Sequence, residues 1–152
     1  MVEQPRTGAE RKADVTAKLE APHADTWVAT AAPSAVAHLV PLSFAWDERH
    51  IILATEPASV TARNLQASGQ ARLAFGATRD VVMVDAVLDA AIDLEDVPPA
   101  LADAYARQAA WDPRGAGGVY VYFLLRPRRI QAWCEANELS GRTVMRDGGW
   151  LV

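Results

Sequence analysis

The stretch HLVPLSFAWDERHIILATEPASVTARNL, residues 38–65, decides the fold of this 152-residue chain. Two apolar runs flank a charged turn at residues 47–49, which predicts a strand, a tight turn and a second strand over residues 50–55. Residues 59–66 are then predicted to form a helix, which Ser68-Gly69 terminates. The whole unit is therefore expected to be a strand hairpin followed by a short loop and a helix.

The head of this helix carries two hydroxyls, a cation and an amide, at Ser59, Thr61, Arg63 and Asn64. A helix N-terminus presents free N–H groups and the positive end of the helix dipole, so it suits a bound anion. The sequence therefore predicts that the unit holds the phosphate of a flat cofactor whose ring lies along the preceding hairpin. A simpler interpretation also remains open, in which Ser59 is only the N-cap of a surface helix.

The remaining segments surround this unit with further strands. Residues 1–7 are predicted to be a frayed tail and residues 8–20 a surface helix. A third helix is predicted over residues 101–110. Pro127 is predicted to break the last apolar run into two strands, and residues 140–152 are predicted to form a polar tail. The predicted strands cover residues 26–32, 36–46, 50–55, 71–77, 81–94, 119–125 and 128–135.

About seven sequential strands with a few short helices indicate a mainly β fold. Turns recur about every eight to twelve residues, which is typical of antiparallel sandwiches and barrels. The sequence shows no β-α-β alternation, so a doubly wound parallel sheet is not expected. Residues 1–25 are predicted to be an N-terminal tail and short helix, and residues 26–152 a single barrel domain. Because side chains fill so small a barrel, a flat ligand is expected outside it, at an edge or a subunit interface.

The composition narrows the class of protein. The chain has 15 Lys and Arg against 19 Asp and Glu, a net charge of −4, so neither a nucleic acid nor an anionic membrane is expected as partner. The single Cys134 excludes an intrachain disulfide, and no Cys and His residues have zinc spacing, so no metal site is expected. No apolar run reaches the roughly 18 residues of a membrane span. A soluble cytoplasmic protein is predicted.

Two separated motifs carry a family resemblance. The first runs through residues 41–47 (Pro-Leu-Ser-Phe-Ala-Trp-Asp), 52–55 (Ile-Leu-Ala-Thr) and 59–65 (Ser-x-Thr-Ala-Arg-Asn-Leu). The second is Arg-Ile-Gln-Ala-Trp at residues 129–133, followed by Arg142 and then Trp150. Together they resemble the pyridoxamine 5′-phosphate oxidase-like flavin-binding split-barrel superfamily. This resemblance implies an antiparallel split β-barrel with Greek-key order, a homodimer, and two flavin sites at the subunit interface.

The resemblance also implies a set of cofactor-binding residues. They are His38, Pro41, Leu42, Ser43, Phe44, Thr55, Ser59, Thr61, Arg63, Asn64, Arg129, Trp133 and Arg142. The phosphate loop of the family usually reads Thr-x-x-x-Ser-Arg-Lys, and here Val60 and Thr61 replace the two cations. Arg63, further along the same helix, is the expected substitute.

Simpler structural roles remain open for several of these side chains. Trp133 is expected either to line the site from the partner subunit or to pack in the core. The arginines of residues 126–129 either bind an anion, such as the acidic tail of a deazaflavin, or form a solvated edge that discourages sheet-to-sheet pairing. His38 faces either solvent or the polar edge of the ring. Trp46 and Tyr120 are further candidates for the pocket wall.

Residues 134–141, after the signature Trp133, contain neither the Arg nor the His that hold the substrate phosphate in true pyridoxamine phosphate oxidases. We therefore expect another activity on the same fold. The predicted protein is an oxidoreductase that binds FMN, or alternatively the deazaflavin coenzyme F-420, and transfers hydride to or from a small-molecule substrate. The sequence identifies no catalytic acid or base. The alternative from another class is a flavin- or haem-binding carrier or sensor without turnover.

Overall fold

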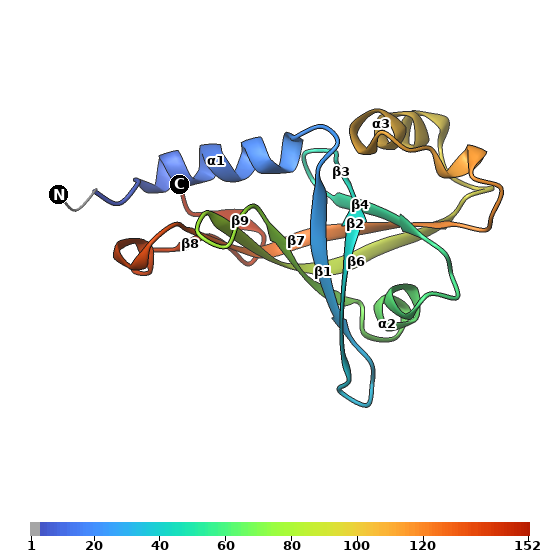
Figure 1. The fold of residues 1–152 in the computed structure, drawn as a ribbon, viewed down its shortest axis with the longest axis horizontal. Coiled ribbons are helices and arrows are strands. Elements are labelled where there is room, and N and C mark those ends of the chain that lie inside the picture. Colours follow the sequence, from blue (N-terminus) through green and yellow to red (C-terminus); the bar gives the residue numbers. More distant parts are fainter. Residues whose placement is uncertain (1–3) are drawn as a thin grey trace.

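One antiparallel sheet dominates the computed structural model, which describes residues 4–152 (Figure 1). The first three residues of the predicted tail lie outside this described part. The main path of the sheet runs β2-β1-β5-β6-β7-β4-β3, and β8 and β9 continue it beside β7. Its nine strands are β1 Asp25–Ala31, β2 Ala37–Ser43, β3 Ala45–Trp46, β4 Ile51–Thr55, β5 Gln70–Phe75, β6 Val81–Asp93, β7 Val121–Trp133, β8 Thr143–Arg146 and β9 Gly149–Trp150.

The short connection between the two ends of this sheet path explains why the sheet forms a barrel. β2 and β3 lie at opposite ends of the sheet, yet only Phe44 separates them in sequence. The sheet therefore curls until its two edges approach each other, and the mainly β split barrel expected from the sequence is confirmed. The single strand expected over residues 36–46 is wrong, because Phe44 turns inward at this corner. Its ring is buried and meets the ring of Phe75 edge-on, with 5.0 Å between centroids.

Three helices cover the sheet: α1 Gly8–Glu20, α2 Val60–Ser68 and α3 Pro99–Ala109. In Figure 1, α1 and α3 lie above the sheet and α2 lies below it, next to the β1–β2 hairpin. α1 adds Val15 and Leu19 to the main core inside the barrel, whereas α3 packs Tyr105 into a smaller second core beside Tyr122. None of the helices within residues 4–152 is long and apolar enough to span a bilayer.

Local capping hydrogen bonds determine where the helix α2 begins and ends. The Ser59 hydroxyl accepts a hydrogen bond from the amide of Ala62 and so caps the N-terminus. Gly69 takes a left-handed conformation, with φ of 68°, and its N–H donates to the carbonyl of Leu65. The helix predicted over residues 59–66 is therefore confirmed, and it fixes the direction in which the loop after β4 approaches the barrel.

Pro127 does not break its strand, so the prediction of two separate strands there is wrong. β7 is continuous from Val121 to Trp133, and β6 pairs with it through a bulge that adds Arg128 to the β7 side. Pro127 also lies in the stretch between Leu125 and Ile130, where neither β4 nor β8 pairs with β7. A proline is tolerated at a bulge and at an unpaired strand edge because no ladder bond is lost there.

Residues 4–7 and residues 140–152 are more ordered than the sequence predicts. The predicted polar tail at residues 140–152 forms the hairpin of β8 and β9, which buries Val144 and Met145 against the free edge of β7. The predicted frayed tail is anchored at Arg6, whose guanidinium binds the buried carboxylate of Glu138 at 2.7 Å. Both corrections depend on partners distant in sequence, which no local pattern reveals.

Candidate functional site

One pocket brings together four of the predicted cofactor residues. It is a hollow of about 430 Å³, and Pro41, Leu42, Ser43 and Thr55 lie in its wall. The first three come from the end of β2 and Thr55 ends β4. These two strands are at opposite sides of the sheet path, and the curling of the barrel brings their ends to one cavity.

The loop after β4 connects this pocket to the N-terminus of α2. The Thr55 hydroxyl donates to the Ser59 hydroxyl at 3.3 Å, and Ser59 in turn accepts from the amide of Ala62 at 3.1 Å. The amides of Val60 and Thr61 have no acceptor among the described residues. An anion at this helix end would therefore find two free N–H donors and the positive end of the helix dipole.

The four polar residues predicted at the helix head have different surroundings. Thr61 and Asn64 are 3% and 4% exposed, and the Asn64 amide donates to the hydroxyl of Thr30 at 3.1 Å, which attaches α2 to β1. Arg63 is exposed and forms no ion pair with any described residue. Arg63 is thus the cation of this helix that remains available to a phosphate.

His38 of β2 and Phe44, which directly follows β2, frame the hairpin side. His38 is half-buried and lies opposite Thr30 in the β1–β2 ladder, on the side of the strand that faces α2. The side chain of Phe44 is in the core, so only its backbone can face a ligand. The hairpin therefore offers mainly backbone groups and small side chains to the pocket.

The C-terminal motif forms a separate group. The guanidinium of Arg142 lies over the ring of Trp133, 5.5 Å from its centroid, and the Ala132 amide donates to the Arg142 carbonyl. Trp133 ends β7, while Thr55 pairs with Val121 at the other end of the same strand. Twelve residue steps of strand span about 40 Å. Within one chain, this group and the pocket cannot form one site.

The arginines of residues 126–129 are ion-paired. Arg129 binds Asp85 at 2.9 Å and Arg126 binds Asp89 at 3.0 Å, and Arg128 lies 3.8 Å from Asp147. Partial burial acts to raise the pKa of Asp85, but hydrogen bonds and charge from Arg72 and Arg129 hold that pKa below its usual value. These charges are largely balanced, which matches the solvated-edge interpretation better than a free basic groove.

Sequence reasoning missed the opposite wall of the pocket. Tyr105 of α3, with Trp111 and Tyr120 from the following loop, completes the cavity. The Trp111 ring meets both tyrosine rings edge-on, with centroids 6.4 Å from Tyr105 and 5.2 Å from Tyr120. Only Tyr120 was a candidate from the sequence. The three aromatic residues are spread over 16 positions, and the fold of the α3 segment alone brings them together.

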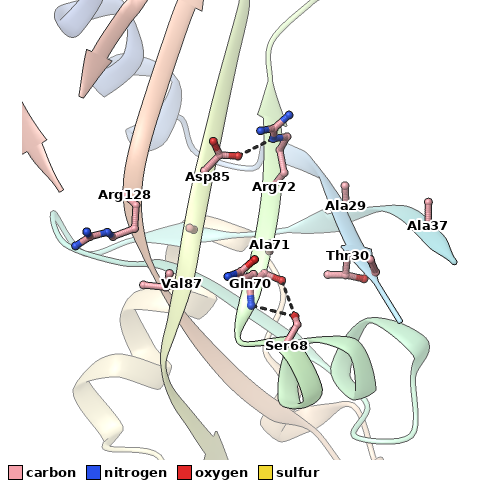
Figure 2. Close-up of a pocket in the computed structure, with 12 residues that line it drawn as sticks. Ala29, Thr30, Ala37, Ser68, Gln70, Ala71, Arg72, Asp85, Val87 and Arg128 are labelled. Atoms are coloured by element: carbon pink, nitrogen blue, oxygen red, sulfur yellow. Dashed lines mark hydrogen bonds and ion pairs between the residues drawn. The ribbon is translucent and has the colours of Figure 1, made fainter. Parts of the chain in front are cut away.

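A larger hollow, of about 630 Å³, lies on the outer face of β1, β5 and β6 (Figure 2). Small residues such as Ala29, Ala31 and Ala37 line it, and the Arg72–Asp85 ion pair forms one rim. It contains none of the predicted cofactor residues. We therefore place the candidate ligand site in the smaller pocket, where the predicted residues meet. The larger hollow is left as a feature of the outer surface of the sheet.

Comparison with known families identifies the chain. Residues 15–134 match the family model described as pyridoxamine 5′-phosphate oxidase, which is well over half of the sequence. The chain belongs to the pyridoxamine 5′-phosphate oxidase family. The superfamily resemblance of the two sequence motifs is thereby confirmed. No curated protein matches the sequence significantly.

Solved structures share the split barrel of this family at low sequence identity. An F-420 reductase superposes with a TM-score of 0.61 at 16% identity, over 75% of this chain and 93% of its own. A conserved hypothetical protein from Mycobacterium tuberculosis has a TM-score of 0.63 at 16% identity, covering 90% and 92%. A heme binding protein from Mycobacterium smegmatis has a TM-score of 0.61 at 15% identity, covering 94% and 58%. At these identities the likeness shows the fold.

Proposed function

We propose that this protein is an oxidoreductase that binds FMN in the pocket between β2 and β4 and functions as a homodimer. The observation that carries the proposal is the convergence of Pro41, Leu42, Ser43 and Thr55 on one cavity beside the α2 N-terminus, in a member of a flavin-binding family. When bound, the flavin supplies the hydride chemistry, and the protein supplies binding and orientation.

The residues of the pocket fit the parts of FMN unequally. The hydroxyls of Thr55 and Ser59 and the two free amides of α2 offer hydrogen bonds to a phosphate, and Arg63 offers a charge. The strand 41–43 offers backbone groups to the edge of a flat ring. The fit is weaker than a loop with two cations would give, because Val60 is an exposed apolar residue at the first of those positions.

A second copy of the chain would complete the site. Trp27 and Leu39 are 51% and 60% exposed, and their neighbours Pro41 and Ala29 in the β1–β2 ladder share the same face. Exposed apolar faces of this kind mark protein interfaces. A partner on this face is the proposed source of the Trp133–Arg142 group, which one chain cannot bring to its own pocket.

We propose FMN and not the deazaflavin coenzyme F-420 because of the charges that the chain can offer to each cofactor. The acidic tail of a deazaflavin needs free cations beyond the phosphate loop. The arginines of residues 126–129 are engaged by Asp85, Asp89 and Asp147. The substrate remains a small molecule of unassigned identity, and vitamin B6 phosphate oxidation is not proposed. A cytoplasmic location also stays a prediction.

The visible spectrum of the purified protein tests the proposal. We expect a yellow protein, or a colourless one that takes up added FMN with a shifted flavin band. Bleaching of that band by NADPH and its recovery with an acceptor would support turnover. A protein that binds neither FMN nor the deazaflavin would contradict the proposal.

Replacing Arg63 tests the phosphate end of the site. Arg63→Ala should weaken FMN binding by about 1–3 kcal/mol, because a charge-assisted hydrogen bond to phosphate is lost. Riboflavin, which lacks the phosphate, should bind both proteins equally. Arg49→Ala, at an exposed arginine on the β3–β4 turn, is the matched control and should bind FMN normally. Unchanged FMN affinity in Arg63→Ala, measured by fluorescence titration, would remove Arg63 from the site.

A haem-binding role is the second candidate, and the structural likeness to a heme binding protein favours it. His38, half-buried beside α2, is the histidine of β2 that could serve as an axial ligand. Titration with haemin distinguishes the two roles. A sharp Soret band that His38→Ala abolishes, together with no uptake of FMN, would favour haem over flavin.

A further inference from the structure

Within the described part of the chain, one hydrogen bond between side chains attaches the helix α2 to the barrel. The Asn64 amide nitrogen donates to the Thr30 hydroxyl at 3.1 Å, and the two residues are 4% and 6% exposed. Ala62 and Leu65 of the same helix pack into the main core. Apolar packing has no preferred direction, whereas a hydrogen bond weakens steeply when its angle is poor. The Asn64–Thr30 bond therefore fixes how α2 is rotated and translated on the sheet.

This bond connects the two ends of the proposed flavin site. Asn64 follows Val60 by about 6 Å along the helix, and the Val60 amide has no acceptor among the described residues. Thr30 pairs with His38 in the β1–β2 ladder, and β2 continues from there to residues 41–43 in the pocket. Neither Asn64 nor Thr30 lines that pocket. The bond therefore sets the distance between the helix end that would hold a phosphate and the strand that would face a ring.

We propose that Thr30 and Asn64 are positioning residues that make the site select FMN over riboflavin. FMN must place its phosphate at the α2 amides and its ring at residues 41–43 at the same time, whereas riboflavin has no phosphate. A spacing that is fixed before binding therefore favours FMN alone. Asn64 acts through the position of its helix, in place of the direct cofactor contact that the sequence predicts. The inference rests on the proposed function, because it concerns the same site.

Thr30→Val tests the role of the hydrogen bond, because it removes the hydroxyl with little change in side-chain shape and leaves the Asn64 amide without its acceptor. Fluorescence titration of the purified protein should show FMN affinity about five- to tenfold weaker and riboflavin affinity unchanged. Thr30→Ser keeps an acceptor at this position and should restore most of the FMN affinity. Unchanged FMN affinity in Thr30→Val, or equal losses for FMN and riboflavin, would overturn the proposal.

Thr26 provides a matched control on the same buried face of β1. It is 1% exposed, and its hydroxyl donates to the carbonyl of Ala74 in β5 at 3.0 Å and not to α2. Thr26→Val should therefore keep the wild-type ratio of FMN to riboflavin affinity. An equal fall of that ratio in Thr26→Val would show a general loosening of the fold and would also overturn the proposal. If the wild type binds no FMN, the proposed function fails together with this inference, whereas equal FMN binding by wild type and Thr30→Val removes this inference alone.

Discussion

A single charge on the outer face of β2 is expected to convert the protein into a monomer that no longer binds flavin. Leu39 is 60% exposed in the chain, which is unusual for a leucine at the centre of a strand. In a symmetric dimer each copy would contribute the same residue to the interface. Leu39→Glu would therefore bury two unpaired carboxylates, each costing roughly 3–5 kcal/mol. We expect the dimer to dissociate at micromolar concentration.

Two measurements on the same samples check this result. Size-exclusion chromatography with light scattering should show the mass of one chain instead of two, and FMN titration should show the loss of most of the affinity. Leu151→Glu is the matched control, because Leu151 is exposed to a similar extent, 50%, but lies after β9. It should remain dimeric and yellow. A Leu39→Glu protein that stays dimeric would exclude this face as the interface.

The second large effect is expected at the anchor of the N-terminus. The Glu138 carboxylate is 5% exposed and accepts hydrogen bonds from the backbone and guanidinium of Arg6 and from the amide of Cys134. The side-chain bond from Arg6, above all, lowers the pKa of Glu138 from 4.5 to about 2. Glu138→Gln removes this charge, so we expect the free energy of unfolding at neutral pH to fall by roughly 2–3 kcal/mol.

The same substitution should also change how the free energy of unfolding depends on pH in the acid range. A lowered folded-state pKa means that the stabilisation is complete above pH 4.5 and is lost as the pH falls towards 2. The difference in unfolding free energy between the wild type and Glu138→Gln should therefore shrink over that interval by most of its value at neutral pH. Urea unfolding at fixed protein concentration measures it.

Glu135→Gln provides the control for this prediction. Glu135 lies three residues away and forms an exposed ion pair with Arg79, in which both side chains are more than half exposed. Such a pair contributes about 0–1 kcal/mol, so its loss should have a small effect at every pH. Equal destabilisation by the two variants would show that the Arg6–Glu138 contact is not the anchor of the N-terminal segment.

Local chemistry predicts those elements whose signals lie within a few residues of each other. Ser59 and Gly69 delimit α2 through contacts made inside the helix itself. The valines at the start of β6 predict a strand although its aspartates recur with helical spacing. Pro127 was misjudged because its cost depends on whether a neighbouring strand needs its N–H, which is a property of the assembled sheet.

The sequence by itself determined the family and the barrel class, because these depend on short motifs in order. Only the tertiary structure decided that β2 and β4 meet at one pocket, that Tyr105 and Trp111 close it, and that Trp133 and Arg142 lie at the opposite end of β7. The physical reason is that residues form a site only when they lie close together in space. The curling of the sheet sets those distances, and the spacing of residues along the chain does not encode them directly.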